Sequence, residues 1–244
     1  MIRIIWYYIV LFVSSVVHGL GSIGAAMLGV KSRPGGVYDW GTRDWARWVL
    51  WGAGTRVLVD GLDRIPRDTP VVYASNHSSM FDIWALSLVL PGSTRFVAKQ
   101  ELGKIPIVGP AMKRVGHIMI DRHAPAKAME AYAEAAQRIR GGVSPIVFPE
   151  GTRSRDGRLL PFKNAPFGLA IAAQVPLVPV YVHDTFEILP KGAWRLRPKP
   201  IRVLIGAPIP TAGLAPADRM NLRDQAHAAI AAMRARVDAQ TATP

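Results

Sequence analysis

Short apolar runs alternate with stretches of helical periodicity along the chain after residue 56. The apolar runs predict strands over 57–59, 71–74, 95–98, 117–120, 145–148, 177–182 and 201–205. Helical periodicity and its end signals predict helices over 80–90, 126–139, 166–173 and 216–237. This alternation is typical of an α/β domain. We therefore predict a mixed, mostly covered β-sheet flanked by helices over 57–238, followed by a loose tail over 239–244.

The first 56 residues have a different pattern. No Asp, Glu, Lys or Arg occurs between Ile4 and Val30, and the stretch is long enough to cross a bilayer. Its first half is the more apolar, and Gly19, Gly21 and Gly24 interrupt the second half. A signal peptide is disfavoured because motifs typical of cytosolic proteins follow. A membrane span and a helix lying in the membrane interface both remain open.

A helix that starts near residue 37 would carry four tryptophans within an arc of roughly 140°: Trp40, Trp45, Trp48 and Trp51. Tryptophan favours the headgroup level of a membrane. Arg43 and its neighbours would reach lipid phosphates from there, although Asp44 lies in the same arc. The alternative is that these rings pack on the globular core. We predict that residues 1–56 form hydrophobic and amphipathic helices associated with a membrane.

Composition narrows the function classes. The formal net charge is +13 and hydrophobic residues make up 50% of the chain, which excludes a disordered protein and fits an anionic membrane surface. The sequence contains no cysteine, which excludes a disulfide scaffold and a cysteine-ligated metal site. No basic and aromatic pattern of a nucleic-acid-binding module occurs. A G-x-G-x-x-G match over 19–24 lacks the short preceding strand and the following helix of a dinucleotide site.

The segment 75–82 follows a predicted strand and opens a predicted helix. His77 is the only one of six histidines followed five residues later, in such a turn, by a carboxylate, that of Asp82. A carboxylate on one imidazole nitrogen fixes the tautomer and supports protonation of the other nitrogen. The same residues fit a helix cap, with Asp82 three positions after Ser79. Catalysis and capping both remain open on this segment.

Two further segments place cations at strand ends. Lys99 and Arg122 each end a predicted strand and would meet at one rim of the sheet, where they would suit a phosphate or form ordinary surface charge. Another strand runs into a turn formed by Glu150, Gly151, Thr152 and Arg153. Its backbone N–H groups would form an anion nest, or the segment is a simple polar turn. Pro176 and Pro179 around the next strand suit an edge strand or the wall of an apolar groove.

Taken in order, these segments resemble the four sequence blocks of the glycerolipid acyltransferase family, specifically the 1-acyl-sn-glycerol-3-phosphate acyltransferases. The first block, Asn-His-x-Ser-x-x-Asp, is matched by Asn76, His77, Ser79 and Asp82. The second is matched by Lys99, Glu101, Leu102, Pro106, Gly109, Gly116, Asp121 and Arg122. The third, Phe-Pro-Glu-Gly-Thr-Arg-Ser, is matched throughout 148–154, and the fourth by Pro176, Pro179 and Val180. His117 stands where the family usually has an apolar residue, which leaves its local packing open.

The resemblance implies an enzyme that transfers a fatty acyl group from acyl-CoA or acyl-carrier protein to the sn-2 hydroxyl of lysophosphatidic acid, giving phosphatidic acid. His77 would act as the general base, oriented by Asp82, with no covalent acyl-enzyme. No metal and no cofactor beyond the acyl donor are expected, because the thioester is already reactive. The alternative function is the same chemistry on another lysolipid acceptor, of the ornithine-lipid or glycolipid type.

The resemblance also implies roles for the cations. Arg153, with Arg122 or Lys99, would hold the acceptor phosphate, in a turn completed by Gly151 and Thr152. Lys99 or backbone N–H groups near it would stabilise the oxyanion. Glu150 would orient neighbouring cations.

In the family a two-helix N-terminal element lies on the membrane, which fits residues 1–56 and favours embedding without a full crossing. The expected partners are lysophosphatidic acid, the acyl donor and the membrane surface, with no nucleic acid. The expected location is the cytoplasmic face of a bacterial inner membrane. A basic run with one tryptophan either adds contact to anionic lipid or forms a solvated loop: Lys191, Trp194, Arg195, Arg197, Lys199 and Arg202.

Overall fold

A seven-stranded sheet forms the centre of the chain, whose residues 1–121 and 125–242 are described in a computed structural model. The strand order is β1-β7-β6-β2-β5-β3-β4, and every neighbouring pair is parallel except β6 and β7. The strands are β1 (Val57–Asp60), β2 (Val72–Ser75), β3 (Ser93–Lys99), β4 (Ile118–Ile120), β5 (Val143–Val147), β6 (Leu177–His183) and β7 (Ile201–Ile205). The predicted mixed α/β sheet is confirmed.

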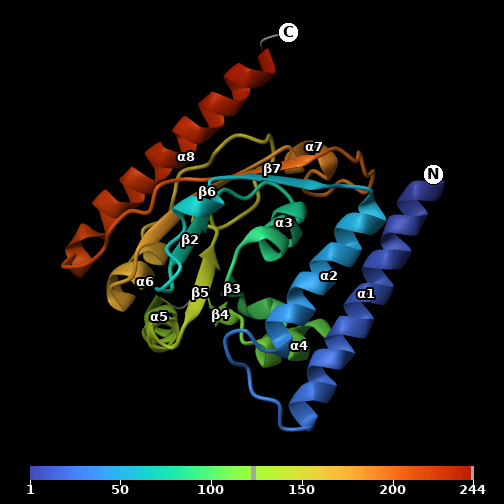
Figure 1. The fold of residues 1–244 in the computed structure, drawn as a ribbon, viewed down its shortest axis with the longest axis horizontal. Coiled ribbons are helices and arrows are strands. Elements are labelled where there is room, and N and C mark those ends of the chain that lie inside the picture. The colour runs from blue at the N-terminus through green and yellow to red at the C-terminus, as the bar shows by residue number, and fades with distance from the viewer. Residues whose placement is uncertain (122–124, 243–244) are drawn as a thin grey trace.

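Helices cover both faces of the sheet, and the described part of the chain is an α/β/α sandwich (Figure 1). The helices are α1 (Ile2–Met27), α2 (Val37–Ala53), α3 (Phe81–Val89), α4 (Val108–Val115), α5 (Pro125–Arg140), α6 (Ala165–Ala173), α7 (Thr185–Ile188) and α8 (Arg219–Ala242). On β2, Tyr73 packs with the layer of α1, α2 and α3, while Val72 and Ala74 pack with α5, α6 and α8. Successive strand residues therefore supply two separate cores, as the period of two requires.

Three details differ from the prediction. The final helix α8 continues to Ala242, so residues 239–242 of the expected loose tail are helical, and 243–244 lie outside the described residues. β6 lies between β7 and β2, so the strand that contains Pro179 is interior and not an edge strand. The helices α4 and α7 were not predicted: α4 follows a residue at positive φ, Ile107, and α7 is a single turn.

The N-terminal helix α1 is continuous, which corrects the expected interruption at its glycines. Gly19 lies where α1 crosses α4, and a Cβ at this position would lie 2.7 Å from Cγ2 of Ile107. The glycine therefore serves close helix packing, and the rejection of a dinucleotide site is confirmed because the motif lies inside one long helix. Among the described residues, α1 is the one helix long and apolar enough to cross a membrane.

The four tryptophans of α2 divide between the two interpretations. Trp45 packs on the core, with its ring 6.0 Å from that of Trp84. Trp40, Trp48 and Trp51 are exposed. Arg43 donates a hydrogen bond of 2.5 Å to the carbonyl of Gly92, so its guanidinium holds a loop and is not directed at a lipid phosphate. The helix thus buries one indole and presents three to its surroundings.

A buried ion pair joins α2 to the sheet. Nη1 of Arg95 on β3 lies 2.5 Å from Oδ1 of Asp39, and the Arg95 side chain is 1% exposed. Ser93 donates to the same carboxylate oxygen at 3.0 Å, and the backbone N–H of Gly35 donates to Oδ2 at 2.8 Å. Removing one partner of a buried pair is costly because the other charge is left uncompensated. The pair therefore fixes α2 against the strand that ends at Lys99.

His117 has a structural role. Its Nδ1 accepts a hydrogen bond of 3.0 Å from the backbone N–H of Phe96, immediately before the paired residues of β3 and β4. Burial, assisted by the nearby Arg95 and Arg138, lowers the pKa of His117 to about 3. The ring is therefore neutral at pH 7, and it continues the strand pairing where an apolar residue would leave the N–H of Phe96 without this acceptor.

Candidate functional site

The candidate residues lie at one edge of the sheet. The strands β6, β2, β5 and β3 are consecutive neighbours and run parallel, so their carboxyl ends lie at the same edge. The segments that leave these ends are 76–80 after β2, 148–154 after β5, the end of β3 at Lys99, and the start of α7 after β6. In open α/β sheets, ligands bind outside this edge.

The imidazole of His77 is held on two sides in the loop between β2 and α3. Its Nδ1 lies 2.7 Å from Oδ2 of Asp82, in the first turn of α3. Its ring stacks on Phe148, with 4.0 Å between centroids and 15° between planes. A carboxylate only accepts hydrogen bonds, so Nδ1 carries the proton and Nε2 has the free lone pair. Nε2 is therefore the atom able to take a proton from a bound molecule.

Asp82 contacts both the imidazole of His77 and the backbone that leads into α3. Its side chain is fully buried, and Oδ2 accepts hydrogen bonds from the backbone N–H groups of Ser78 at 2.7 Å and Ser79 at 2.9 Å. The same oxygen accepts the hydrogen bond of His77. The two N–H groups precede Met80, the N-cap of α3, and α3 has no side-chain cap, so these bonds fix the carboxylate that faces His77 without capping the helix.

Thr185 at the start of α7 contacts this carboxylate from the opposite side and was not predicted. Its fully buried hydroxyl donates to Oδ1 of Asp82. The hydroxyl oxygen of Ser78 lies 2.9 Å from Oγ1 of Thr185. Because Thr185 has one hydroxyl proton and the carboxylate can only accept, Ser78 must donate to Thr185. Two hydroxyl groups therefore form a chain that ends on the carboxylate behind His77.

The backbone of the His77 loop is fixed by two neighbouring segments. The amide of Asn76 pairs with the backbone of Val182 on β6, with hydrogen bonds of 2.9 and 2.7 Å. The carbonyl of His77 accepts from the N–H of Ser154 at 2.8 Å. The N–H of His77 donates to Oε1 of Glu150 at 2.8 Å. The position of the imidazole is thus set by β6 and by the turn after β5.

The observed contacts of Glu150 correct its expected role of orienting cations. Its two carboxylate oxygens accept from backbone N–H groups, those of His77 at 2.8 Å and Leu160 at 3.3 Å. The side chain is buried, and burial raises the pKa of Glu150 to about 8 although both hydrogen bonds oppose the shift. Glu150 therefore joins two loops. A contact to a backbone N–H leaves no signature in the sequence, which is why this role was missed.

The glycine turn after β5 lies beside the His77 loop, through the bond between Ser154 and His77. Gly151 has φ of +73°, a conformation that a residue with a side chain rarely adopts. Thr152 is exposed, and its hydroxyl accepts a hydrogen bond of 3.0 Å from Nζ of Lys191. Arg153 is half-buried and lies one residue before Ser154. Arg153 thus lies one residue away from the backbone contact between this turn and His77.

The two remaining candidate cations are Lys99 and Arg122. Lys99 is exposed at the carboxyl end of β3, which pairs with β5 and not with β2. Two strand spacings place β3 about 10 Å from β2, so Lys99 lies at the same edge, two strands away from the strand that precedes His77. Arg122 lies outside the residues that the structure describes.

Comparison with known proteins gives consistent matches. The sequence model of the family described as Acyltransferase matches residues 56–183. A 1-acyl-sn-glycerol-3-phosphate acyltransferase of Cocos nucifera is 34% identical over 74% of this chain and 58% of its own length. The 1-acyl-sn-glycerol-3-phosphate acyltransferase alpha of Homo sapiens is 38% identical over 70% of this chain and 61% of its own. This chain thus spans about three fifths of the length of these relatives.

A solved structure is similar over the whole chain. The crystal structure of the 1-acyl-sn-glycerophosphate (LPA) acyltransferase PlsC of Thermotoga maritima superposes with a TM-score of 0.80 at 25% sequence identity. The superposition covers 100% of this chain and 96% of that chain. The N-terminal helices and the sheet domain are therefore both part of the shared architecture.

Proposed function

The chain belongs to the acyltransferase family, and from this premise we propose that it transfers a fatty acyl group from a thioester to the sn-2 hydroxyl of lysophosphatidic acid, giving phosphatidic acid. The observation that carries the proposal is the His77–Asp82 contact beside the turn of Arg153. The contact leaves His77 with one free nitrogen, and the bond between Ser154 and His77 joins its loop to the turn of Arg153, a cation that suits a phosphate. The relatives named as 1-acyl-sn-glycerol-3-phosphate acyltransferases support this acceptor.

In the proposed reaction, Nε2 of His77 removes the proton of the sn-2 hydroxyl as its oxygen attacks the thioester carbonyl. The C–O bond forms and the carbonyl becomes a tetrahedral oxyanion. When this species collapses, the C–S bond breaks and the protonated imidazole returns its proton to the leaving thiolate. Asp82 keeps Nδ1 protonated and stabilises the imidazolium that exists between the two proton transfers. The step needs no metal and no covalent enzyme intermediate.

The cations of the edge would bind the charged parts of the substrates. We assign the acceptor phosphate to Arg153 and its turn, with Arg122 or Lys99 as the second cation. Lys99 is also the proposed donor to the oxyanion, together with backbone N–H groups near it. Acyl-CoA and acyl-carrier protein are the proposed donors.

We further propose that the chain works at a membrane, at the cytoplasmic face of a bacterial inner membrane. Exposed apolar side chains along α1, such as Ile2, Phe12 and Leu20, and the exposed tryptophans of α2 support this location. Lysophosphatidic acid and phosphatidic acid reside in bilayers, so an active edge next to these helices would meet its substrate there.

Mass spectrometry of the lipid product tests the proposal. Purified protein is supplied with acyl-CoA and, in separate reactions, lysophosphatidic acid, a lyso-ornithine lipid and a lysoglycolipid. We expect phosphatidic acid from the first reaction and little product from the others. If product formed only from another acceptor, the protein would catalyse the same reaction on a different lysolipid, and the assignment of the substrate would be overturned.

The variant Arg153→Ala tests the phosphate assignment. Loss of a charge-assisted contact is expected to raise KM for lysophosphatidic acid about tenfold or more, with a smaller change in kcat. Steady-state kinetics in mixed micelles measure both constants. Arg158→Ala, an exposed arginine of the same loop, is the control and is expected to leave KM nearly unchanged. An unchanged KM in Arg153→Ala would remove Arg153 from the phosphate site.

A further inference from the structure

The loop after α7 joins the active edge of the sheet to helix α1. The carbonyl of Leu189, at its start, accepts a hydrogen bond of 2.8 Å from the hydroxyl of Ser79. Further along, Nζ of Lys191 donates to the hydroxyl of Thr152 at 3.0 Å. The carbonyl of Trp194 then accepts from the hydroxyl of Tyr8 on α1 at 3.1 Å. Lys191, which contacts the turn of the candidate site, is therefore only three positions before Trp194, which contacts α1.

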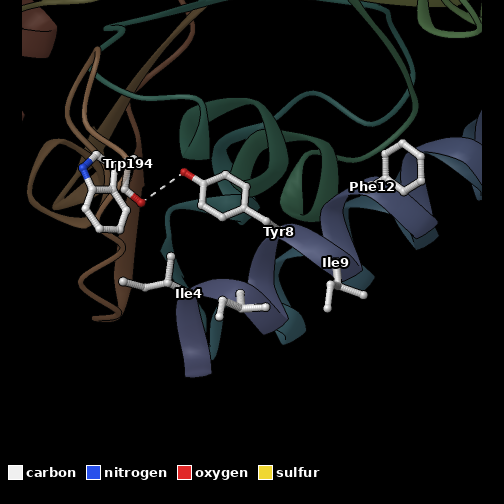
Figure 2. A pocket seen from close by; sticks show the side chains of 6 residues that line it. Ile4, Tyr8, Ile9, Phe12 and Trp194 are labelled. Atoms are coloured by element: carbon white, nitrogen blue, oxygen red, sulfur yellow. Dashed lines mark hydrogen bonds between the residues drawn. The ribbon is translucent and has the colours of Figure 1, made fainter. Parts of the chain in front are cut away.

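An apolar groove of about 510 Å³ lies where this loop meets α1. It is lined by Ile4, Ile5, Tyr8, Ile9, Phe12 and Trp194. Figure 2 shows that Ile4 and Tyr8 point toward Trp194, while Phe12 continues the lining along the helix. Phe12 is 70% exposed and Trp194 is 57% exposed. Large apolar side chains gathered at one exposed place indicate a binding surface for an apolar ligand.

Helix α1, which lines the groove, packs against the helix that carries Asp82. Tyr7, next to Tyr8, stacks on Phe81 with 5.8 Å between ring centroids. Phe81 directly precedes Asp82 in α3. Two stacked rings therefore connect the helix that lines the groove with the helix that carries Asp82.

The loop also carries cations, and the first of them contacts the turn of the candidate site. The ammonium group of Lys191 has three N–H donors, and the hydroxyl of Thr152 accepts one of them. Lys191 is exposed, and Arg195 and Arg197 follow on the same loop. Lys191 and Trp194 are at most about 10 Å apart along the chain. A single short segment thus combines a cation beside Arg153 with an indole in an apolar groove.

We propose that Lys191 binds the phosphate of the lysolipid acceptor and that the groove of α1 and Trp194 binds its acyl chain. This inference rests on the proposed function and deepens it. It adds a residue that binds the phosphate outside the predicted motifs, and it says where the acyl chain of the acceptor lies. Charge complementarity indicates the ligand. A lipid with an anionic head group and one acyl chain matches a cation, Lys191, that lies three residues before the tryptophan of an apolar groove.

The test uses octyl, decyl and dodecyl phosphate, which have the anionic head and the chain but no hydroxyl to acylate. Isothermal titration of the full chain below the critical micelle concentration of each probe gives the dissociation constants. A methylene that is half covered in an open groove is expected to strengthen binding about twofold. Inorganic phosphate, which has no chain, is expected to report the cations alone.

Two variants separate the two ends of the site. Lys191→Gln is expected to weaken all three probes about tenfold without changing the gain per methylene. Trp194→Ala is expected to reduce that gain to nearly none while octyl phosphate is affected least. Trp40→Ala is the matched control, because Trp40 is 64% exposed on α2 and does not line the groove.

An unchanged gain in Trp194→Ala, an equal loss in Trp40→Ala, or undiminished binding in Lys191→Gln would overturn the inference. These outcomes are independent of turnover because the probes are not substrates. Failure of the proposed function would appear separately, as absence of phosphatidic acid in the product assay.

Discussion

Of the three histidine–aspartate pairs in the described chain, two lie in different regions and have equally accessible histidines. His77 and Asp82 meet at the active edge, with Nδ1 and Oδ2 2.7 Å apart. His18 on α1 and Asp44 on α2 meet in the helical layer, with Nε2 and Oδ2 3.1 Å apart. The side chains of both histidines are 14% exposed. Burial of the imidazole and the presence of a carboxylate therefore do not distinguish them.

The difference lies in the second ring nitrogen. Nδ1 of His18 lies 2.8 Å from the carbonyl of Ser14 within α1, and Nε2 contacts Asp44 on α2, so both of its nitrogens are engaged. His77 uses Nδ1 for Asp82, and its Nε2 is the nitrogen available to substrate. Asp82 is fully buried, whereas Asp44 is 18% exposed and also pairs with Arg47. A histidine–aspartate pair becomes a candidate catalyst only when one ring nitrogen stays free and the carboxylate has a fixed position.

The largest expected effect separates the two pairs directly. His77→Ala is expected to lower kcat about 10³-fold, because general base catalysis typically contributes 10²- to 10⁴-fold. His18→Ala is expected to change kcat per folded molecule less than about twofold while it destabilises the α1–α2 contact by about 1 kcal/mol. Turnover and thermal unfolding of both variants measure these quantities.

The stability of His77→Ala is the control for this comparison. The unfolding midpoint of His77→Ala is expected to stay close to that of the parent, so that lost turnover reports chemistry. If His77→Ala retained the turnover of the parent, or if His18→Ala lost as much, the distinction between free and engaged nitrogens would be wrong.

A smaller effect is expected from the hydroxyl behind the active pair. Thr185→Val keeps the shape of the side chain but removes the donor to Oδ1 of Asp82, and we expect kcat to fall about tenfold. Thr185→Ser restores a hydroxyl and is expected to recover most of the loss. A positioning role further predicts that the pH–rate profile of kcat shifts in Thr185→Val and returns in Thr185→Ser, which a packing defect would not produce.

The smallest effect on turnover is expected at Glu150, where the pH dependence of stability changes instead. Burial raises the pKa of Glu150 to about 8 from a model-compound value of 4.5, so between these values the folded state binds more protons than the unfolded state. The free energy of unfolding therefore falls as the pH rises from about 4.5 to about 8. Glu150→Gln removes this contribution while an amide oxygen can still accept from the N–H of His77.

Urea unfolding at several pH values checks this prediction. The stability of Glu150→Gln relative to the parent is expected to increase from pH 5 to pH 8, with kcat changed less than about threefold. A constant difference between the two proteins across this range would show that Glu150 does not change protonation on folding in the way the raised pKa implies.

The sheet was predictable because its signals are local. The strand β7 occupies Ile201–Ile205, as predicted, since an apolar run bounded by prolines and glycine defines it. The helix α4 was missed because it begins after Ile107, a β-branched residue at φ of +64° that no propensity favours. The continuity of α1 was missed because contacts with α2 and α4 override the cost of its glycines.

The site was predictable to the extent that its residues are close in sequence. His77 and Asp82 are five residues apart, so the chain itself indicates their contact, which the structure confirms. Thr185 lies 103 residues from Asp82, and Asp39 lies 56 residues from Arg95. Hydroxyl groups and charged side chains that are so far apart in the sequence form no recognisable motif, so their contacts could not be predicted. Only the order of the strands brings them together.

The Asp39–Arg95 pair has a mechanical consequence. Its charges are shielded from the solvent, so ionic strength and lipid composition act on it far less than on exposed contacts. Helix α2 therefore cannot pivot freely relative to β3. If the helical layer rests in a bilayer, the depth and tilt of the reactive edge are set by a bond inside the protein, and every lysolipid is met at one fixed height above the leaflet.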